Sequence, residues 1–197
     1  MLVISVRRVI FISMPRPFAL LITWTCYGTW LPGDRRGFVS NAVQPGRGWL
    51  PKLNTPGTPY RADEPAAYRL ARQLQRRASV RLDVAEARRV ATALRESAER
   101  RGWRILRAAV MAKHVHVVVA ECPPDASVVR RALKGVSQAA LNRLAGAPKR
   151  WWTAGGSDRY LNDESSIDAA VAYVANQRGI LAEIVGDAMD KRRSWPE

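Results

Sequence analysis

Two apolar segments in the middle of the chain constrain its fold more than any other feature. Residues 103–113 read WRILRAAVMAK, and residues 114–121 read HVHVVVAE. Both segments are short and rich in aliphatic and β-branched residues, and only a few residues around Met111 to Lys113 separate them. This pattern predicts two neighbouring strands that form one hairpin.

Helical patterns stand on both sides of the predicted hairpin. Residues 83–102 begin with Asp83 and carry Glu86 three positions later, which is the spacing of a capping box. On the other side, Asp125 is placed to cap a helix over residues 126–144. Similar patterns predict strands over residues 16–30 and 157–163 and helices over residues 63–77 and 165–179.

The order of these elements predicts an α+β fold. It matches a ferredoxin-like antiparallel sheet of the βαββαβ type, with helices on one face and an added C-terminal helix that bears Tyr173. The domain is expected over residues 16–181, with a long Gly- and Pro-rich loop over residues 31–62 that excludes regular elements. Residues 1–15 are interpreted as a loosely ordered leader or an extra edge strand. Residues from 180 onward are interpreted as a short helix and a basic tail over 182–197.

The chain carries a large excess of positive charge. Its 197 residues include 32 Lys and Arg against 17 Asp and Glu, which gives a formal net charge of +15. This excess favours nucleic acid as the partner, although a basic protein from an arginine-rich proteome is the alternative. Two isolated cysteines fit reduced thiols in the cytoplasm. No apolar run reaches the roughly 20 residues of a membrane span, so no membrane partner is expected.

Both histidines of the chain lie in one predicted strand, a single residue apart. Because side chains alternate between the faces of a strand, His114 and His116 point the same way, with Cα atoms roughly 7 Å apart. Two imidazoles at this separation can converge on one metal ion, while Val115, Val117 and Val119 fill a core on the other face. The alternative is a pair of hydrogen-bonded histidines on a wet face of the sheet.

The predicted last helix carries two polar side chains on one flank. Tyr173 and Gln177 are four residues apart and therefore neighbours on the helix surface. They lie beside a buried stripe formed by Ile167, Ala170, Val171 and Val174. Taken alone, this spacing favours an ordinary rim tyrosine and an ordinary surface glutamine.

The histidine strand and the tyrosine helix together resemble the one-tyrosine transposases of the HUH endonuclease superfamily. The branch is that of REP-associated tyrosine transposases and insertion-sequence transposases. The superfamily's His-hydrophobic-His signature is matched by residues 114–116. Its other signature, a Tyr followed four residues later by Gln or Asn, is matched by Tyr173 and Gln177. The stretches YGTWLPGD, ALKGVSQAALN and DRYLNDESSIDAAVAYV add support, and the similarity covers about residues 16–181 in the family's order.

The resemblance implies a divalent ion, Mg²⁺ or Mn²⁺, held by His114, His116 and Gln177. Many relatives carry Asn-Pro where this chain reads Gln-Arg after the tyrosine, so the third ligand stays open between Gln177 and Asn176. The resemblance also makes Tyr173 the nucleophile. It implies a single-stranded DNA endonuclease and strand transferase that cuts at or near imperfect-palindrome hairpins through a 5′-phosphotyrosine bond and rejoins strands. Relatives act as monomers or homodimers.

Basic and aromatic residues outside this core are predicted to bind the DNA. Lys134, within a stretch that matches the family, is the leading candidate. The full set is Lys134, Arg130, Arg131, Lys149, Arg150, Trp152, Arg35 and Arg36. Solvated helix faces are the alternative for the cations, and core packing is the alternative for at least one tryptophan of the pair 151–152.

Other functions compete with the nuclease. A non-catalytic ferredoxin-like module could bind nucleic acid on its sheet, although the predicted strands lack an aromatic platform. A domesticated transposase would keep the same catalytic residues. A metal-dependent hydrolase of small phosphoesters would use the histidines but leave the charge and the tyrosine helix unexplained.

Overall fold

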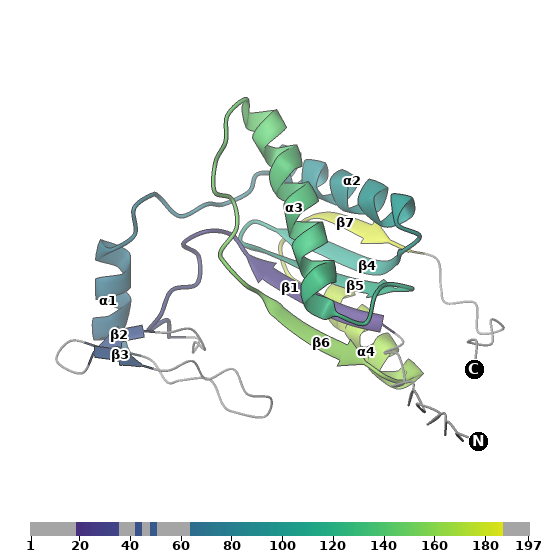
Figure 1. Cartoon of the computed structure of the whole chain (residues 1–197), viewed down its shortest axis with the longest axis horizontal. Helices are drawn as coiled ribbons and strands as arrows, with labels where there is room; N and C mark the ends of the chain where they lie inside the picture. The colour runs from purple at the N-terminus through teal and green to yellow at the C-terminus, as the bar shows by residue number, and fades with distance from the viewer. Residues whose placement is uncertain (1–18, 36–41, 45–47, 51–63, 187–197) are drawn as a thin grey trace, which may run out of the picture.

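A five-stranded antiparallel sheet forms the centre of the computed structural model, which describes residues 19–35, 42–44, 48–50 and 64–186 (Figure 1). In spatial order its strands are β6 (Ser157–Leu161), β1 (Ala19–Thr25), β5 (His114–Ala120), β4 (Arg104–Met111) and β7 (Ile180–Val185). All neighbours are antiparallel. The first four strands have the order of a ferredoxin-like sheet, so the predicted α+β class is confirmed.

Helices cover both faces of this sheet (Figure 1). Those among the described residues are α1 (Pro65–Gln73), α2 (Val84–Arg100), α3 (Ala126–Ala145) and α4 (Glu164–Ala175). α2 and α3 pack on one face, where Leu20, Ile22 and Trp24 of β1 are buried. The added helix α4 packs on the opposite face over a smaller core. The chain therefore builds two cores, one on each side of the sheet.

Strand β5 contributes to both cores by alternation, as predicted. Val115, Val117 and Val119 are fully buried under α2 and α3. Val118 and Ala120 belong to the core under α4, so the two histidines, which have the same parity, face α4 as well. The hairpin between β4 and β5 turns after Met111, again as predicted.

Side-chain caps fix where the helices begin. Asp83 and Glu86 form the predicted capping box of α2, and the Asp125 carboxylate accepts two backbone N–H groups at the start of α3. Asp163 forms a capping box with Ser166 at the start of α4. Each of these contacts satisfies backbone donors that the first helical turn leaves unpaired.

Two sequence-based expectations were wrong in detail. Residues 180–185 form strand β7, not a short helix, and this strand runs four residues beyond the predicted boundary at 181. β7 pairs with β4, and an ion pair of 2.5 Å between Arg107 and Glu183 joins the two strands. The loop at 31–62 was expected to contain no regular element. It contains a short antiparallel ribbon of β2 (Ala42–Gln44) and β3 (Gly48–Leu50).

The remaining described segments frame the sheet. α1 contacts β2 and lies with the β2–β3 ribbon to one side of the sheet (Figure 1). Cys26 is buried and Cys122 half-buried, and both are free thiols, as expected. In the part of the chain that the structure describes, no helix is both long and apolar enough to cross a membrane. The predicted leader at 1–15 and tail residues 187–197 lie outside the described residues.

Candidate functional site

The two histidines form the floor of a pocket on the α4 side of the sheet. Their imidazole centroids lie 5.0 Å apart, with the ring planes at 82°. The predicted arrangement on one face is therefore correct. The pocket has a volume of about 160 Å³, and its lining residues are Thr23, Thr25, Thr29, Trp30, Lys113, His114, His116, Tyr173 and Gln177.

Strand pairing gives His116 a fixed partner. Thr23 of β1 stands opposite His116 in the register, and Thr23 Oγ1 shares a hydrogen bond of 2.6 Å with His116 Nδ1. His116 is only 6% exposed. Burial, with a smaller contribution from His114, lowers the pKa of His116 to about 4. The ring is therefore neutral at pH 7, and its Nε2 atom stays available for a ligand in the pocket.

Helix α4 brings the tyrosine over this floor. Its buried residues Ile167, Ala170 and Val174 anchor it to the sheet, as the predicted stripe requires. Tyr173, on the flank of that stripe, places its ring centroid 5.4 Å from that of His116. Tyr173 is nevertheless 51% exposed, so a large substrate can reach its hydroxyl.

Gln177 and Asn176 are separated by the end of α4. Asn176 is the C-cap residue, is exposed and does not line the pocket. Gln177 lines the pocket, and its Nε2 donates to the backbone oxygen of Tyr173 at 3.1 Å. This bond uses the nitrogen of the Gln177 amide and leaves its oxygen as a free acceptor. The geometry therefore favours Gln177 over Asn176 as the third polar group beside the histidines.

The donor set suits a divalent ion of intermediate softness. Two imidazole nitrogens and an amide oxygen are ligands that Mn²⁺ accepts readily and Mg²⁺ less so. Among the described residues no group of three or more His, Cys, Asp or Glu could hold a metal, so the amide or substrate oxygens must complete such a site. The residues present fit a metal whose remaining positions are open to substrate.

Most of the other lining residues were not predicted from the sequence. Thr23 and Thr25 reach the pocket because β1 pairs with β5. The turns after β1 and before β5 add Thr29, Trp30 and the exposed Lys113. The positions of Thr23 and Thr25 beside the histidines depend on the register between β1 and β5, which is a long-range contact. None of the described lining residues is acidic, so a lysine ammonium is the only charged group at the rim.

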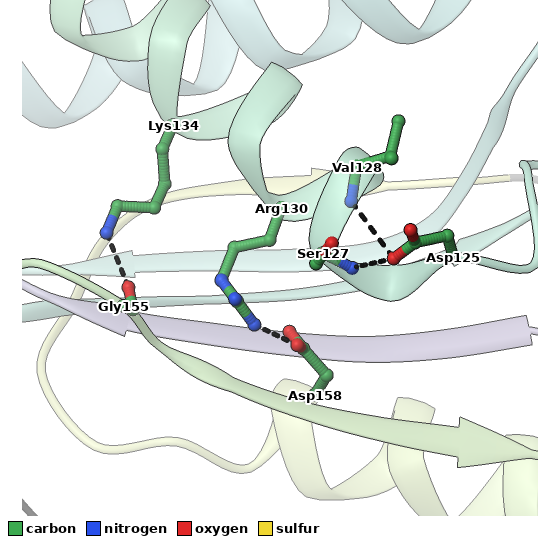
Figure 2. A network of polar contacts seen from close by, with 7 residues as sticks. All are labelled: Asp125, Ser127, Val128, Arg130, Lys134, Gly155 and Asp158. Atoms are coloured by element: carbon green, nitrogen blue, oxygen red, sulfur yellow. Dashed lines mark hydrogen bonds and ion pairs between the residues drawn. The ribbon is translucent and has the colours of Figure 1, made fainter.

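Two of the predicted DNA-binding cations form hydrogen bonds or ion pairs within the protein (Figure 2). Lys134 Nζ donates to the backbone oxygens of Thr153 and Gly155, at 2.6 and 2.5 Å. Arg130 forms an ion pair with Asp158. From α3, Lys134 reaches the segment before β6 and Arg130 reaches β6 itself, and α3 lies on the sheet face opposite the histidines. Their contact with DNA stays a prediction.

The role predicted for Trp152 in DNA binding was wrong. The predicted role in base stacking requires an open ring face, but Trp152 is only 5% exposed. Its indole packs against Trp24 in the core under α2 and α3, with ring centroids 6.0 Å apart. An isolated bridge between Cys26 and Trp152 extends β1 and fixes this position. The apolar ring is thus part of the core.

The other predicted DNA contacts are exposed. Lys149 lies over the Trp151 ring with its Nζ 4.0 Å from the centroid, and the Arg150 guanidinium lies 5.2 Å from the centroid of the Tyr27 ring. Arg131 and Arg35 are exposed. None of these four lines the histidine pocket. Arg36 falls outside the described residues.

Comparison with known proteins gives a distant likeness. No protein-family model matches the chain, and no curated protein matches it in sequence. Among solved structures, a REP-associated tyrosine transposase bound to a REP hairpin is similar, with a TM-score of 0.41 and 14% identity over 87% of this chain and 70% of that chain. A likeness this remote leaves the function to be argued from the site itself.

Proposed function

We propose that the chain is a metal-dependent single-stranded DNA endonuclease and strand transferase of the transposase kind. It cuts at or near hairpins through a covalent 5′-phosphotyrosine intermediate. The observation that supports this most strongly is the convergence of Tyr173 with His116 at 5.4 Å in one pocket. A phenol hydroxyl beside two imidazoles and an amide is a set suited to phosphoryl transfer without a water nucleophile.

Tyr173 supplies the attacking oxygen. Its Oη forms a bond to the scissile phosphorus, the bond from phosphorus to the 3′-oxygen breaks, and the phenol proton passes to solvent. The released 3′-oxygen takes up a proton and becomes a free hydroxyl. Because the phosphodiester energy is kept in the tyrosine ester, a second 3′-hydroxyl can reverse the step and join strands.

The other pocket residues bind and orient the phosphate. His114, His116 and Gln177 would hold a divalent ion, Mn²⁺ or Mg²⁺, which when bound supplies charge neutralisation at the scissile phosphate. Thr23 fixes the ring of His116. The Lys113 ammonium at the rim adds a positive charge on the side where substrate enters.

The competing functions find less support. Among the described residues, helices pack on both faces of the sheet over its central strands, which leaves less sheet surface for a module that stacks bases on its strands. The pocket of about 160 Å³ is smaller than the roughly 300 Å³ at which small-molecule sites begin, which disfavours a hydrolase of small phosphoesters. A domesticated transposase is compatible with the same chemistry.

A denaturing gel tests the proposal. The full chain is incubated with Mn²⁺ and a pool of single-stranded oligonucleotides that carry variable hairpins, labelled at either end. We expect a boiling-resistant protein–DNA adduct that retains the 3′ label and not the 5′ label. The adduct should vanish with Tyr173→Phe and with EDTA, and fall at least about 100-fold with His116→Ala.

Tyr160 provides the matched control. It is 50% exposed, as Tyr173 is 51% exposed, but it lies on β6 outside the pocket. Tyr160→Phe should therefore form the adduct as the wild type does. An adduct that persists in Tyr173→Phe would refute the assigned nucleophile, and equally fast cutting of duplex DNA would refute the single-strand substrate.

A further inference from the structure

A second, wider hollow lies beside the C-terminal end of α1. It has a volume of about 570 Å³ and is lined by Arg72, Gln75, Arg76, Arg77, Ala78 and Ser79. Its three arginines are exposed, and no acidic residue is among its described lining residues. A concave surface with three guanidinium groups and no carboxylate attracts a polyanion.

In the described part of the chain, the three arginines of the hollow form no ion pair with the protein. Within the described part of the chain, the ion pairs of other arginines use Glu96, Glu121, Glu183 and Asp158, and none involves Arg72, Arg76 or Arg77. Arg130, in contrast, forms an ion pair with Asp158. The guanidinium groups of the hollow therefore keep their donors for an external acceptor.

The segment that carries the arginines is fixed to the turn after β1. Ser79 Oγ donates to the Gly28 backbone oxygen at 2.7 Å, and the Val80 backbone N–H donates to the Tyr27 oxygen at 2.9 Å. Gln75 Nε2 bonds both the Arg77 backbone oxygen and Ser79 Oγ, at 2.6 and 3.2 Å. Gly28 has φ +71°, and a Cβ there would meet Gln75 Nε2 at 2.3 Å. A larger residue here would be strained by the positive φ and would displace the Gln75 amide from this contact.

The same turn is a wall of the histidine pocket. Gly28 is held against the arginine segment, and the next two residues, Thr29 and Trp30, line the pocket. The two hollows are therefore neighbours across residues 28–30. A strand whose phosphate occupies the histidine pocket needs to cross only this turn to reach the arginines.

From this geometry we infer that the hollow of Arg72, Arg76 and Arg77 is a second binding site, for the phosphodiester backbone of the DNA strand beyond the cleaved phosphate. The inference rests on the proposed function for the identity of the strand. The arginines position the substrate and take no part in the chemistry. Backbone contacts of this kind bind without reading sequence.

A salt titration of binding tests the inference. The full chain with Tyr173→Phe is titrated with a labelled single-stranded 20-mer in EDTA at several salt concentrations. Replacing Arg72, Arg76 and Arg77 together by Gln should make the slope of log affinity against log salt shallower by about 2, since each lost phosphate contact on a single strand contributes about 0.7.

A second triple variant controls for net charge. Arg88, Arg89 and Arg95 are exposed on α2, which packs on the sheet face opposite the histidine pocket. Their replacement by Gln removes the same charge and should change the slope by less than about 0.7. Equal slopes in the two triple variants would overturn the inference, as would an unchanged slope in the first. Thermal unfolding checks that both variants are folded.

Cleavage kinetics separate this inference from the proposed function. In the chain with Tyr173 intact, the hollow variant should need more DNA for half-maximal cleavage, with an unchanged rate at saturation. If the wild type makes no adduct at all, the proposed function fails, while the EDTA titration still decides whether the hollow binds DNA. If cleavage occurs and the hollow variant shows the wild-type slope of log affinity against log salt, only the inference that the hollow binds DNA is refuted.

Discussion

Thr23 shows how one residue links the sheet to the candidate chemistry. Its hydroxyl bonds His116 Nδ1 at 2.6 Å because β1 and β5 pair in a register that sets the two residues opposite each other. A partner on one ring nitrogen fixes the ring orientation and the nitrogen that faces the pocket. Loss of this partner leaves the buried imidazole free to rotate.

Thr23→Val tests this role. The substitution keeps the shape and the preference for strands, but it removes the hydroxyl. We expect Mn²⁺ affinity, measured by calorimetry, to fall by about tenfold or more, as it does when such outer partners of metal-bound histidines are lost. Thr23→Ser should keep most of the affinity. Equal affinity in Val and Ser variants would show that the hydroxyl does nothing for the metal.

Lys134 gives a test based on pH. Burial, and then the charges of Arg130 and Arg150, lower the pKa of Lys134 from 10.5 to about 8. Between about pH 8 and 10.5 the unfolded chain therefore holds more protons than the folded chain, so folding stability rises with pH in this window. Below about pH 8 both states are protonated, and this contribution is absent.

The measurement compares wild type with Lys134→Met in urea unfolding. The difference in free energy of unfolding should shift in favour of the wild type as the pH rises from 8 to 10.5. A difference that stays flat across this range would place the pKa of Lys134 near its ordinary value.

At the scale of elements, α4 matters most because it carries the tyrosine. Asp163 begins the helix by accepting the Ser166 backbone N–H, and Asp125 begins α3 by accepting those of Ser127 and Val128. Hydrogen bonds from the side chains of Ser165 and Ser127, and then from the backbone N–H groups, lower the pKa of the Asp163 and Asp125 carboxyl groups respectively. The two caps are similar in chemistry, but α3 lies on the sheet face away from the site.

This pair of caps allows a matched experiment. Asp163→Ala and Asp125→Ala should lower the midpoint of thermal unfolding by comparable amounts, since each removes one helix cap. Asp163→Ala alone should also slow adduct formation, because fraying at the start of α4 loosens the helix that positions Tyr173. Equal rates for both variants would indicate that the site does not depend on the start of α4.

Elements with strong local signals were predictable, and the others were not. The capping box of α2 and the alternation in β5 are encoded by adjacent residues, so both were found in the sequence. Strand β7 reads ILAEIV, in which apolar and polar residues do not alternate, and it forms because β4 offers an edge for pairing. The β2–β3 ribbon is shorter still.

At the scale of the whole molecule, the site is a product of tertiary structure. His114 and His116 come from the centre of the sheet, Tyr173 from a helix near the C-terminus, and Thr23 from the first strand. Spacing within one strand made His114 and His116 candidates, whereas Tyr173 became a candidate only through the resemblance to a family signature. The position of Thr23 beside His116 depends on the register between β1 and β5. The arginine hollow depends on the contact of residues 75–80 with Gly28. Both are long-range contacts.

The burial of Trp152 likewise depends on long-range contacts. A basic–aromatic cluster in the sequence favours nucleic-acid stacking, but the choice between surface and core depends on neighbours that are distant in sequence. Trp24 and Cys26, more than a hundred residues earlier, provide those neighbours. Local chemistry therefore points to candidate residues, whereas their burial and their neighbours depend on the tertiary structure.

The most direct test of the account is a crystal structure of the full chain soaked with Mn²⁺, with anomalous scattering used to locate the ion. The account predicts one strong peak within coordination distance of the His114 and His116 rings and of the Gln177 amide oxygen, with the Tyr173 hydroxyl beside it. A peak elsewhere, or none at the histidine pair at saturating Mn²⁺, would contradict it.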